Sequence, residues 1–376
     1  MTRTVAEQQP LFPSLAEHTD HPDPSVRTGR PPADPALEAA IASLIARRGG
    51  SDDVDLLHDM VRNVLGLIDD GTRRGDLKIV NSALADLRAA FRVFGRYDGV
   101  RKVSIFGSAR TPPDHPDYQQ ALAFSARIAS HGYMVITGGG GGVMLAANQG
   151  ASRDRSFGLL IKLPFEPAAN DVIDQDEKLI TFKHFFTRKL SFIKEADAVV
   201  LLPGGFGTLD ECFEALTLIQ TGKTAPVPVV FLDSPGSDYW SSMREHIDQH
   251  LLEHGRIDAD DPALYLLTDD ADHAVSEITG FYRNYHSLRY VGEWTVLRHL
   301  AAVDDRTLGA LNDEFGDLVK SGRIERSGPL PGERDEPRTG HLQRLILRFD
   351  RRRFGRLREL IRRLNQSVPV GEPALG

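Results

Sequence analysis

The chain has 376 residues, of which 41% are hydrophobic, enough for two domains or for one domain with long extensions. Its formal net charge is -8, which argues against a general binder of nucleic acids or membrane surfaces, because both classes usually need a basic face. The single cysteine, Cys212, excludes a disulfide framework and a multi-cysteine zinc site within one chain, and it fits a reducing cytoplasm.

The N-terminal part of the chain predicts a tail followed by helices. Residues 1–35 are rich in Pro, Asp, Thr and Arg and predict a disordered tail without a signal peptide. Residues 36–100 contain apolar residues at spacings of three and four, interrupted by glycine, and predict an extension of two or three helices. No apolar run approaches the roughly 18 residues of a membrane span, so we expect no membrane association.

Residues 101–285 alternate between apolar segments and amphipathic ones. The segments that predict buried strands are "KVSIFGS", "YMVIT", "SFGLLIKLP", "ADAVVLL", "VPVVFLD" and "ALYLLTD". Continuous apolar strands that alternate with helices are typical of a parallel sheet covered on both faces. Because crossovers between parallel strands are right-handed, we expect an α/β fold with a Rossmann-like, doubly wound sheet.

Residues 286–376 show a weaker pattern and predict a small C-terminal α+β extension. "DDRTLGALNDEFGDLVKSG" predicts a helix, "LQRLILRFD" a strand, and "RRRFGRLRELIRRLNQ" a basic helix. The arginines of the basic helix are compatible with nucleic-acid binding. The simpler interpretation, which we favour, is a solvated helix face that packs through its Leu and Ile stripe.

Two strands run into glycine loops, "ITGGGGGVMLAANQG" and "LLPGGFGTLDE", and each loop is followed by a helix. Free backbone N–H groups and the helix dipole attract an anion at such a position, and glycines let phosphate oxygens approach the backbone. Together with "FGSAR" after the first strand, the loops indicate a phosphate-bearing ligand. The first strand lacks a dinucleotide fingerprint, and "GKT" at 222–224 lacks the leading glycine of a P-loop.

The stretch "PGGFGTLDE" has two interpretations. Thr208 and Glu211 fit a capping box, in which the threonine caps the helix and the glutamate folds back onto the first amide. Alternatively, Glu211 lies at the rim of a phosphate site with its carboxylate directed at a sugar. Cys212 follows directly, but a cysteine within an apolar helix that has no assigned histidine partner is expected to belong to the core.

The same stretch, with the Arg188–Lys189 pair on the preceding helix, resembles the LOG (Lonely Guy) family of nucleoside 5′-monophosphate phosphoribohydrolases. The likeness covers residues 102–285 and includes "IFGSAR" and "TGGGGGVM". It is greatest for the larger bacterial members, which have often been labelled lysine decarboxylases. The resemblance implies hydrolysis of the N-glycosidic bond of a nucleotide, without a metal or other cofactor, in a homodimer or higher homo-oligomer.

The resemblance also implies roles for particular residues. Glu211 and Arg188 would be catalytic, since a carboxylate can stabilise the positive charge that develops on ribose as the base leaves. The remaining candidates would bind the substrate: Ser108, Gly139, Gly140, Gly141, Gly142, Glu166, Lys189, Gly204, Gly205, Gly207, Thr208 and Thr217.

The chain departs from short family members before the Arg–Lys pair, where Phe185-Phe186-Thr187 replaces a methionine–histidine sequence. The base pocket is therefore expected to differ, and an unprenylated purine monophosphate such as AMP is favoured over a cytokinin precursor. Two alternatives stay open. One is a non-catalytic binding or sensor protein for a nucleotide or phosphorylated cofactor on the same fold, and the other is a nucleic-acid-associated protein that uses the arginine-rich helix.

Overall fold

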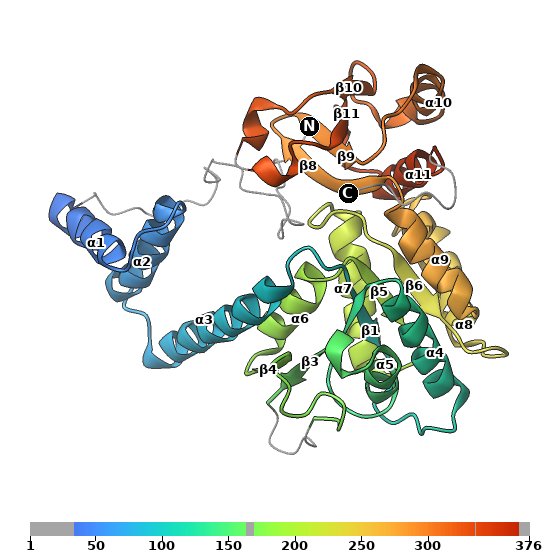
Figure 1. The fold of residues 1–376 in the computed structure, drawn as a ribbon, viewed down its shortest axis with the longest axis horizontal. Helices are drawn as coiled ribbons and strands as arrows, with labels where there is room; N and C mark the ends of the chain where they lie inside the picture. Colours follow the sequence, from blue (N-terminus) through green and yellow to red (C-terminus); the bar gives the residue numbers. More distant parts are fainter. Residues whose placement is uncertain (1–33, 163–168, 335, 368–376) are drawn as a thin grey trace. The chain divides into compact units, whose positions relative to one another are not determined.

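A computed structural model describes residues 34–162, 169–334 and 336–367 of the chain. Contacts divide these residues into two units, one that ends at Ala85 and one that begins at Asp86 (Figure 1). The predicted disordered tail lies almost wholly outside the described residues, as does Glu166.

The first unit is helical, as predicted. It contains α1 (Pro35–Arg47), α2 (Val54–Asp69) and the first half of α3 (Arg74–Phe94), which continues into the second unit. Helix α1 begins where the sequence favours a helix start, because Asp34 accepts a hydrogen bond from the backbone N–H of Ala36 and a proline follows it.

The second unit contains a seven-stranded sheet, and every pair of neighbouring strands is parallel (Figure 1). The strand order is β4-β3-β2-β1-β5-β6-β7. The predicted doubly wound α/β fold is therefore confirmed. The strands are β1 (Lys102–Phe106), β2 (Met134–Thr137), β3 (Ser156–Ile161), β4 (Leu179–Phe182), β5 (Ala198–Leu201), β6 (Val229–Leu232) and β7 (Tyr265–Thr268).

Both faces of this sheet are buried under helices, which explains why its strands are continuously apolar. In β6, Val230 packs into a cluster with the helices of one face, whereas Phe231 packs into the cluster on the other face. The first face is covered by α4 (Pro116–Ser130), α5 (Val143–Ala151) and α9 (Ala271–Phe281). The second is covered by the end of α3 and by α6 (Phe185–Lys194), α7 (Phe206–Gln220) and α8 (Tyr239–Ile247).

The winding direction reverses between β1 and β5. The chain leaves β1 toward β4 on one side of the sheet and then returns to β5, which pairs with the other side of β1. Loops at the carboxyl ends of the strands separate at such a switch point, and ligands of open α/β sheets bind there. The loops after β1 and β5 are the ones that contain "FGSAR" and "PGGFG".

The C-terminal residues add a second, antiparallel sheet of four strands in the order β10-β11-β9-β8, where the sequence predicted only one strand. The last helix packs through Leu357, Leu360 and Ile361, which are fully buried. The elements are β8 (Tyr285–Val291), β9 (Trp294–His299), α10 (Asp305–Phe315), β10 (Glu325–Ser327), β11 (Gln343–Leu347) and α11 (Phe354–Asn365).

The arginines of α11 form ion pairs within the chain. Arg358 lies 2.6 Å from Glu277, and Arg356 lies 2.6 Å from Glu359. The helix is packed, as expected, but its basic face is not wholly solvated, because Arg358 is buried with its ion pair to Glu277. Across the described ranges, no helix is both long and apolar enough to span a bilayer.

Candidate active site

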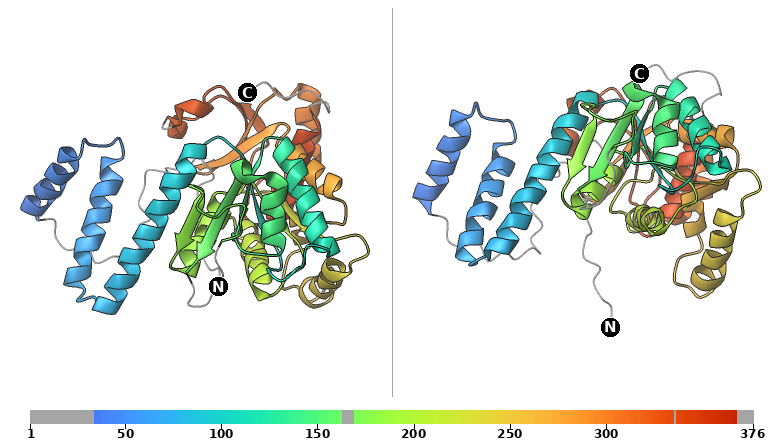
Figure 2. Two further views of the ribbon diagram at one scale, coloured as in Figure 1. Left: turned by 60° about the horizontal axis from the view of Figure 1, so that its bottom comes forward. Right: turned by 90° about the horizontal axis from the view of Figure 1, so that it is seen from below.

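Ser108 joins the three glycine-containing loops at the switch point. Its backbone N–H donates to the carbonyl of Pro203 after β5 (3.1 Å), and its own carbonyl accepts from the N–H of Val143, the first residue of α5 (3.0 Å). The loops that follow β1, β2 and β5 are therefore joined by backbone hydrogen bonds at the carboxyl ends of these strands, in the parallel sheet that Figure 2 shows from two further sides.

The glycine loop after β2 requires glycine at its last position. Gly142 has a φ of +59°, and a Cβ there would lie 2.2 Å from the carbonyl oxygen of Ser108. Asn170 fixes the middle of the loop, because its N–H donates to the carbonyl of Gly139 (2.8 Å) and its side-chain amide donates to that of Gly140 (2.9 Å). The predicted candidates Gly139 to Gly142 thus form one braced loop beside Ser108.

The helix of the "PGGFGTLDE" stretch begins earlier than the capping box requires. Gly205 is the N-cap of α7, so Thr208 is the third helical residue and Glu211 the sixth. The capping-box interpretation is therefore wrong, since the sequence spacing fits but the chain becomes helical before Thr208. Among the residues that the structure describes, no side-chain hydrogen bond caps this helix start. The N–H groups of its first turn can accordingly donate hydrogen bonds to an anion.

Glu211 lies in a shielded position in the second turn of α7. Its side chain is 14% exposed. Its Oε2 atom is buried and has no hydrogen-bond partner within the described part of the chain. A buried carboxylate oxygen without a partner is costly for folding, and such groups occur at sites of function more often than in packed cores.

Burial raises the pKa of Glu211 to about 7, since the charged form loses hydration. The positive charge of Lys189 lowers this pKa, and the carboxylate of Asp210 raises it again. Arg188 also lowers it, which shows that both basic residues act electrostatically on this carboxyl group. A carboxyl group with a pKa near 7 can accept or release a proton at neutral pH.

Lys189 connects α6 to α7. Its Nζ lies 2.7 Å from Asp210, 3.0 Å from Glu214 and 4.0 Å from Oε1 of Glu211. Burial alone would lower the pKa of Lys189, but the hydrogen bonds with Asp210 and Glu214 raise it, so the ammonium stays charged. The charged Lys189 therefore holds the acid-bearing helix against α6.

Arg188 is directed toward the glycine loop. Its Nε donates to the carbonyl of Leu159 in β3 (2.7 Å), and a Cβ on Gly138 would lie 2.7 Å from its Nη2. The guanidinium thus occupies the space that glycine leaves open at the start of the loop. The structure thereby brings Arg188, Lys189 and Glu211 together at the switch point.

Other candidates vary in their placement. Gly204 adjoins this site, and its carbonyl accepts a hydrogen bond from the hydroxyl of Tyr239 (2.7 Å). Gly207 and Thr217 are exposed on α7. The role of Thr217 in binding stays a prediction. Tyr239 and Asn170 were not predicted, because no local pattern in the sequence marks a residue that supports a distant loop.

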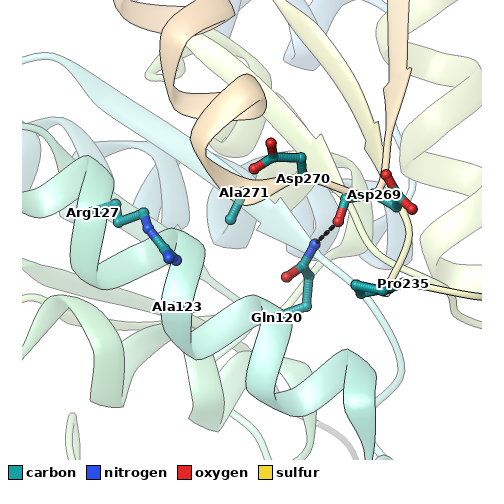
Figure 3. Close-up of a pocket in the computed structure, with 7 residues that line it drawn as sticks. All are labelled: Gln120, Ala123, Arg127, Pro235, Asp269, Asp270 and Ala271. Carbon is teal, nitrogen blue, oxygen red and sulfur yellow. Dashed lines mark hydrogen bonds between the residues drawn. The ribbon is translucent and has the colours of Figure 1, made fainter.

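A separate pocket of about 350 Å³ lies between α4 and the start of α9 (Figure 3). Its polar side chains are engaged: Gln120 donates to the carbonyl of Asp269 (2.6 Å), and Arg127 pairs with Asp272 (2.7 Å). None of the candidate residues lines it. Among the described residues, no group of three or more His, Cys, Asp or Glu side chains is placed to hold a metal ion.

The thiol of Cys212 is buried in the core, as expected, and burial raises its pKa to about 12. Because the thiolate is the reactive form, this cysteine is unsuited to act as a nucleophile at neutral pH.

These features define a doubly wound α/β protein with a buried acid and two basic residues at its switch point. A family described as "possible lysine decarboxylase" matches residues 130–278. A cytokinin riboside 5′-monophosphate phosphoribohydrolase of Mycobacterium tuberculosis is 32% identical over 126 residues, which cover 33% of this chain and 67% of that protein. A probable enzyme of the same name from Oryza sativa subsp. japonica is 25% identical over 185 residues, covering 48% and 77% of the two chains.

The chain belongs to this LOG family of phosphoribohydrolases. Among solved structures, the molybdenum cofactor binding protein from Rippkaea orientalis aligns with a TM-score of 0.33 and 22% identity, over 48% of this chain and 94% of its own. A Moco carrier protein from Chlamydomonas reinhardtii aligns with a TM-score of 0.33 and 22% identity, over 48% and 96%.

Proposed function

We propose that this protein hydrolyses the N-glycosidic bond of a nucleoside 5′-monophosphate and releases the free base and ribose 5-phosphate. The observation that carries the proposal is the buried, unpartnered carboxylate of Glu211 beside Arg188 and Lys189, next to an uncapped helix start. Family membership supports the reaction type, since the related enzymes are named phosphoribohydrolases of a nucleotide.

In the proposed reaction, the 5′-phosphate binds at the start of α7, to the backbone N–H groups of Gly204, Gly205 and Gly207 and to the hydroxyl of Thr208. This helix start offers N–H groups that no side chain caps. Ser108 and the glycine loop after β2 would form the opposite wall. Glu211, six positions into the same helix, would then face the ribose of the bound nucleotide.

Bond cleavage would take place at C1′ of the ribose. The C1′–N bond breaks with its electron pair on the base, which takes up a proton, while a water oxygen bonds to C1′ and loses a proton. The transition state places positive charge on the ribose ring. Ionised Glu211 would stabilise that charge and take the proton from water, and Arg188 would hold the substrate or assist departure of the base.

We propose an AMP-like purine monophosphate as the substrate. The support is Phe185-Phe186-Thr187, which stands where short family members have methionine and histidine before the Arg–Lys pair. Both phenylalanines are exposed at the start of α6, three and two residues before Arg188. Their flat apolar rings are suited to contact a purine ring.

The test is base release from AMP, GMP, CMP, UMP and isopentenyl-AMP, with Glu211→Gln as the control. We expect release of adenine to be fastest and the variant to be nearly inactive. Faster release from isopentenyl-AMP would contradict the proposed preference but not the reaction. Binding of these nucleotides without release from any would contradict the enzyme and support a nucleotide sensor or carrier.

We also propose that the protein is a homo-oligomer assembled through α6 and α7. Phe206 is 93% exposed at the first position of α7, and Phe213 is exposed two turns later on the same helix face. Phe185 and Phe186 are exposed on α6, which Lys189 joins to α7. Large exposed aromatic side chains close together are typical of protein interfaces.

Sedimentation velocity tests this assembly. We expect a species of at least twice the 41.5 kDa chain mass, and dissociation when Phe185 and Phe213 are both changed to Ser. Phe91→Ser is the matched control, since Phe91 is exposed on α3 and should leave the assembly intact. A monomeric wild-type protein at micromolar concentration would contradict the proposal.

A further inference from the structure

We infer that Asp86 is a positioning residue for Arg188, although it lies about a hundred positions earlier in the chain. This inference rests on the proposed function, in which Arg188 contacts the nucleotide. Asp86 lies in the second half of α3, within the same unit as the parallel sheet. Its side chain is buried, with 8% of the residue exposed.

One carboxylate oxygen of Asp86 collects three hydrogen bonds from the start of α6. Oδ2 accepts from the backbone N–H of Lys183 (3.0 Å), the backbone N–H of His184 (3.1 Å) and the hydroxyl of Thr187 (2.8 Å). The three donors span the residues just before α6 and its first turn. A single buried anion therefore fixes where this helix begins.

Helix α6 is not capped by the side chain of its own N-cap residue. Its N-cap residue is His184, which makes no side-chain capping hydrogen bond. Helix starts need a hydrogen-bond acceptor for their free N–H groups, and a negative charge there is favourable to the helix dipole. Asp86 supplies both from a different helix.

Arg188 follows Thr187 directly, so the backbone that Asp86 fixes is the backbone that directs the guanidinium. Thr187 is fully buried, and its carbonyl accepts from the hydroxyl of Ser191 (2.9 Å). At its other end, Arg188 reaches the carbonyl of Leu159 and the edge of the glycine loop. A displacement of about 1 Å in a group that orients substrate is enough to slow a reaction by about 100-fold.

This contact also explains the unusual residue before the Arg–Lys pair. Thr187 has a hydroxyl of the right length to donate to Asp86, whereas a valine of the same shape would leave the buried carboxylate with one donor fewer. Asp86 and Thr187 thus act as a pair, and loss of either should displace Arg188.

The test compares Asp86→Ala, Asp86→Asn and Asp270→Ala. Asp270 is the matched control, because it caps α9 of the same unit by accepting from Asp272 N–H (2.7 Å) and does not take part in the proposed site. We expect Asp86→Ala to lower kcat for AMP by about 10- to 100-fold and to change KM less, because Arg188 is misplaced rather than removed.

Two further readouts separate positioning from general stability. Asp86→Asn should recover much of the lost rate, since its amide oxygen still accepts hydrogen bonds. In an Arg188→Ala background, Asp86→Ala should have little further effect, because residues that act through one another are not additive. Hydrogen exchange should increase over residues 183–189 in Asp86→Ala and over the start of α9 in Asp270→Ala.

Several outcomes would overturn the inference. Equal kcat values for Asp86→Ala and Asp270→Ala in an active enzyme would overturn it. So would a loss of kcat from Asp86→Ala that is as large in the Arg188→Ala background as in the wild-type protein. If the wild-type protein binds AMP but releases no base, the proposed function fails separately. The same comparison is then made on the Kd for AMP, where Asp86→Ala should weaken binding and Asp270→Ala should not. A wild-type protein that neither binds nor cleaves nucleotides would overturn both.

Discussion

Replacing Glu211 with Gln is expected to lower kcat/KM for base release by about 10²- to 10⁴-fold, the range over which a positioned acid or base contributes. Glutamine keeps the shape of the side chain but cannot carry the negative charge that stabilises the ribose cation or take a proton from water. The measurement is the rate of purine release from AMP at saturating and at low substrate concentrations.

Glu195→Gln is the matched control for this experiment. Glu195 is also largely shielded, and it pairs with Lys194 at the end of α6, at the opposite end of the helix from the proposed phenylalanine contacts with the base. The same substitution there should leave base release unchanged. If Glu211→Gln kept more than about a tenth of the wild-type rate, well above the expected range, Glu211 would not be the catalytic acid or base.

The same variant is expected to be more stable than the wild-type protein above pH 7. The pKa of Glu211 is raised from 4.5 to about 7 in the folded protein, so the folded state binds more protons than the unfolded state between these values. The free energy of unfolding of the wild-type protein therefore falls as the pH rises through this range. Above pH 7, ionisation of Glu211 lowers it by about 3 kcal/mol in total. Glutamine does not titrate, so the difference in stability between wild type and Glu211→Gln should vanish below pH 4.5.

Urea denaturation at pH 5 and pH 8 tests this dependence. We expect the Glu211→Gln protein to be about 1 kcal/mol more stable than the wild-type protein at pH 5 and about 3 kcal/mol more stable at pH 8. If Glu211→Gln raised the free energy of unfolding equally at pH 5 and pH 8, ionisation of the Glu211 carboxyl group would not destabilise the folded protein. An increase in stability combined with a loss of activity is typical of a functional group held in an unfavourable environment.

The sequence predicted the parallel sheet and pointed to a candidate site at its glycine loops because both inferences depend on local patterns. Buried parallel strands are continuously apolar, and the glycine loops follow them directly, so β1, β2 and β5 could be identified with their loops. The surroundings of Glu211 could not be predicted in the same way. Its burial depends on how α6 packs on α7, and the capping-box spacing at Thr208 does not show where the helix begins.

The antiparallel sheet was missed for a physical reason that the structure makes plain. Its strands β8, β9 and β11 contain Arg289, Arg298 and Arg344, all of which are almost fully buried. A charged residue at an inward-facing position removes the alternation by which half-buried strands are identified. Sequence patterns assume that arginine faces water, and they cannot show that a loop far along the chain supplies its acidic partners.

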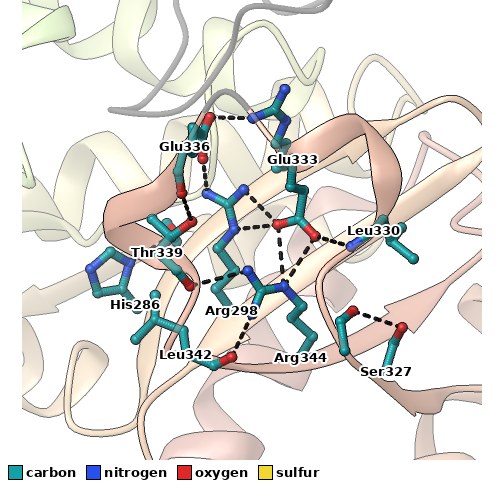
Figure 4. A network of polar contacts seen from close by, with 12 residues as sticks. His286, Arg298, Ser327, Leu330, Glu333, Glu336, Thr339, Leu342 and Arg344 are labelled. Carbon is teal, nitrogen blue, oxygen red and sulfur yellow. Dashed lines mark hydrogen bonds and ion pairs between the residues drawn. The ribbon is translucent and has the colours of Figure 1, made fainter.

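Those partners are Glu333 and Glu336, which lie on the loop before β11 (Figure 4). Oε1 of Glu333 accepts from Nε of Arg298 (2.8 Å), and its Oε2 accepts from Nε of Arg344 (3.0 Å) and from the N–H of Leu330 (2.8 Å). Arg289 and Arg298 both pair with Glu336. The two carboxylates thus form ion pairs with all three buried guanidinium groups.

Glu333→Gln is therefore expected to lower the free energy of unfolding by about 3–5 kcal/mol, the usual cost of removing one partner of a buried ion pair. One carboxylate would remain for three buried guanidinium groups, and the amide nitrogen of glutamine cannot accept from Arg344. The measurement is urea denaturation at pH 7. Glu325→Gln is the matched control, because Glu325 is exposed on β10 of the same sheet and its loss should change stability little.

The pH dependence of this loss provides an independent check. Burial alone would raise the pKa of Glu333, but the hydrogen bonds from Leu330, Arg344 and Arg298 outweigh it and hold that pKa below its ordinary value of 4.5. The stabilisation by Glu333 is accordingly present above pH 4.5 and is lost as the pH falls through the lowered pKa. The difference in free energy of unfolding between wild type and Glu333→Gln should decrease in that acidic range. A difference that stays constant would mean that the charge of Glu333 does not stabilise this sheet.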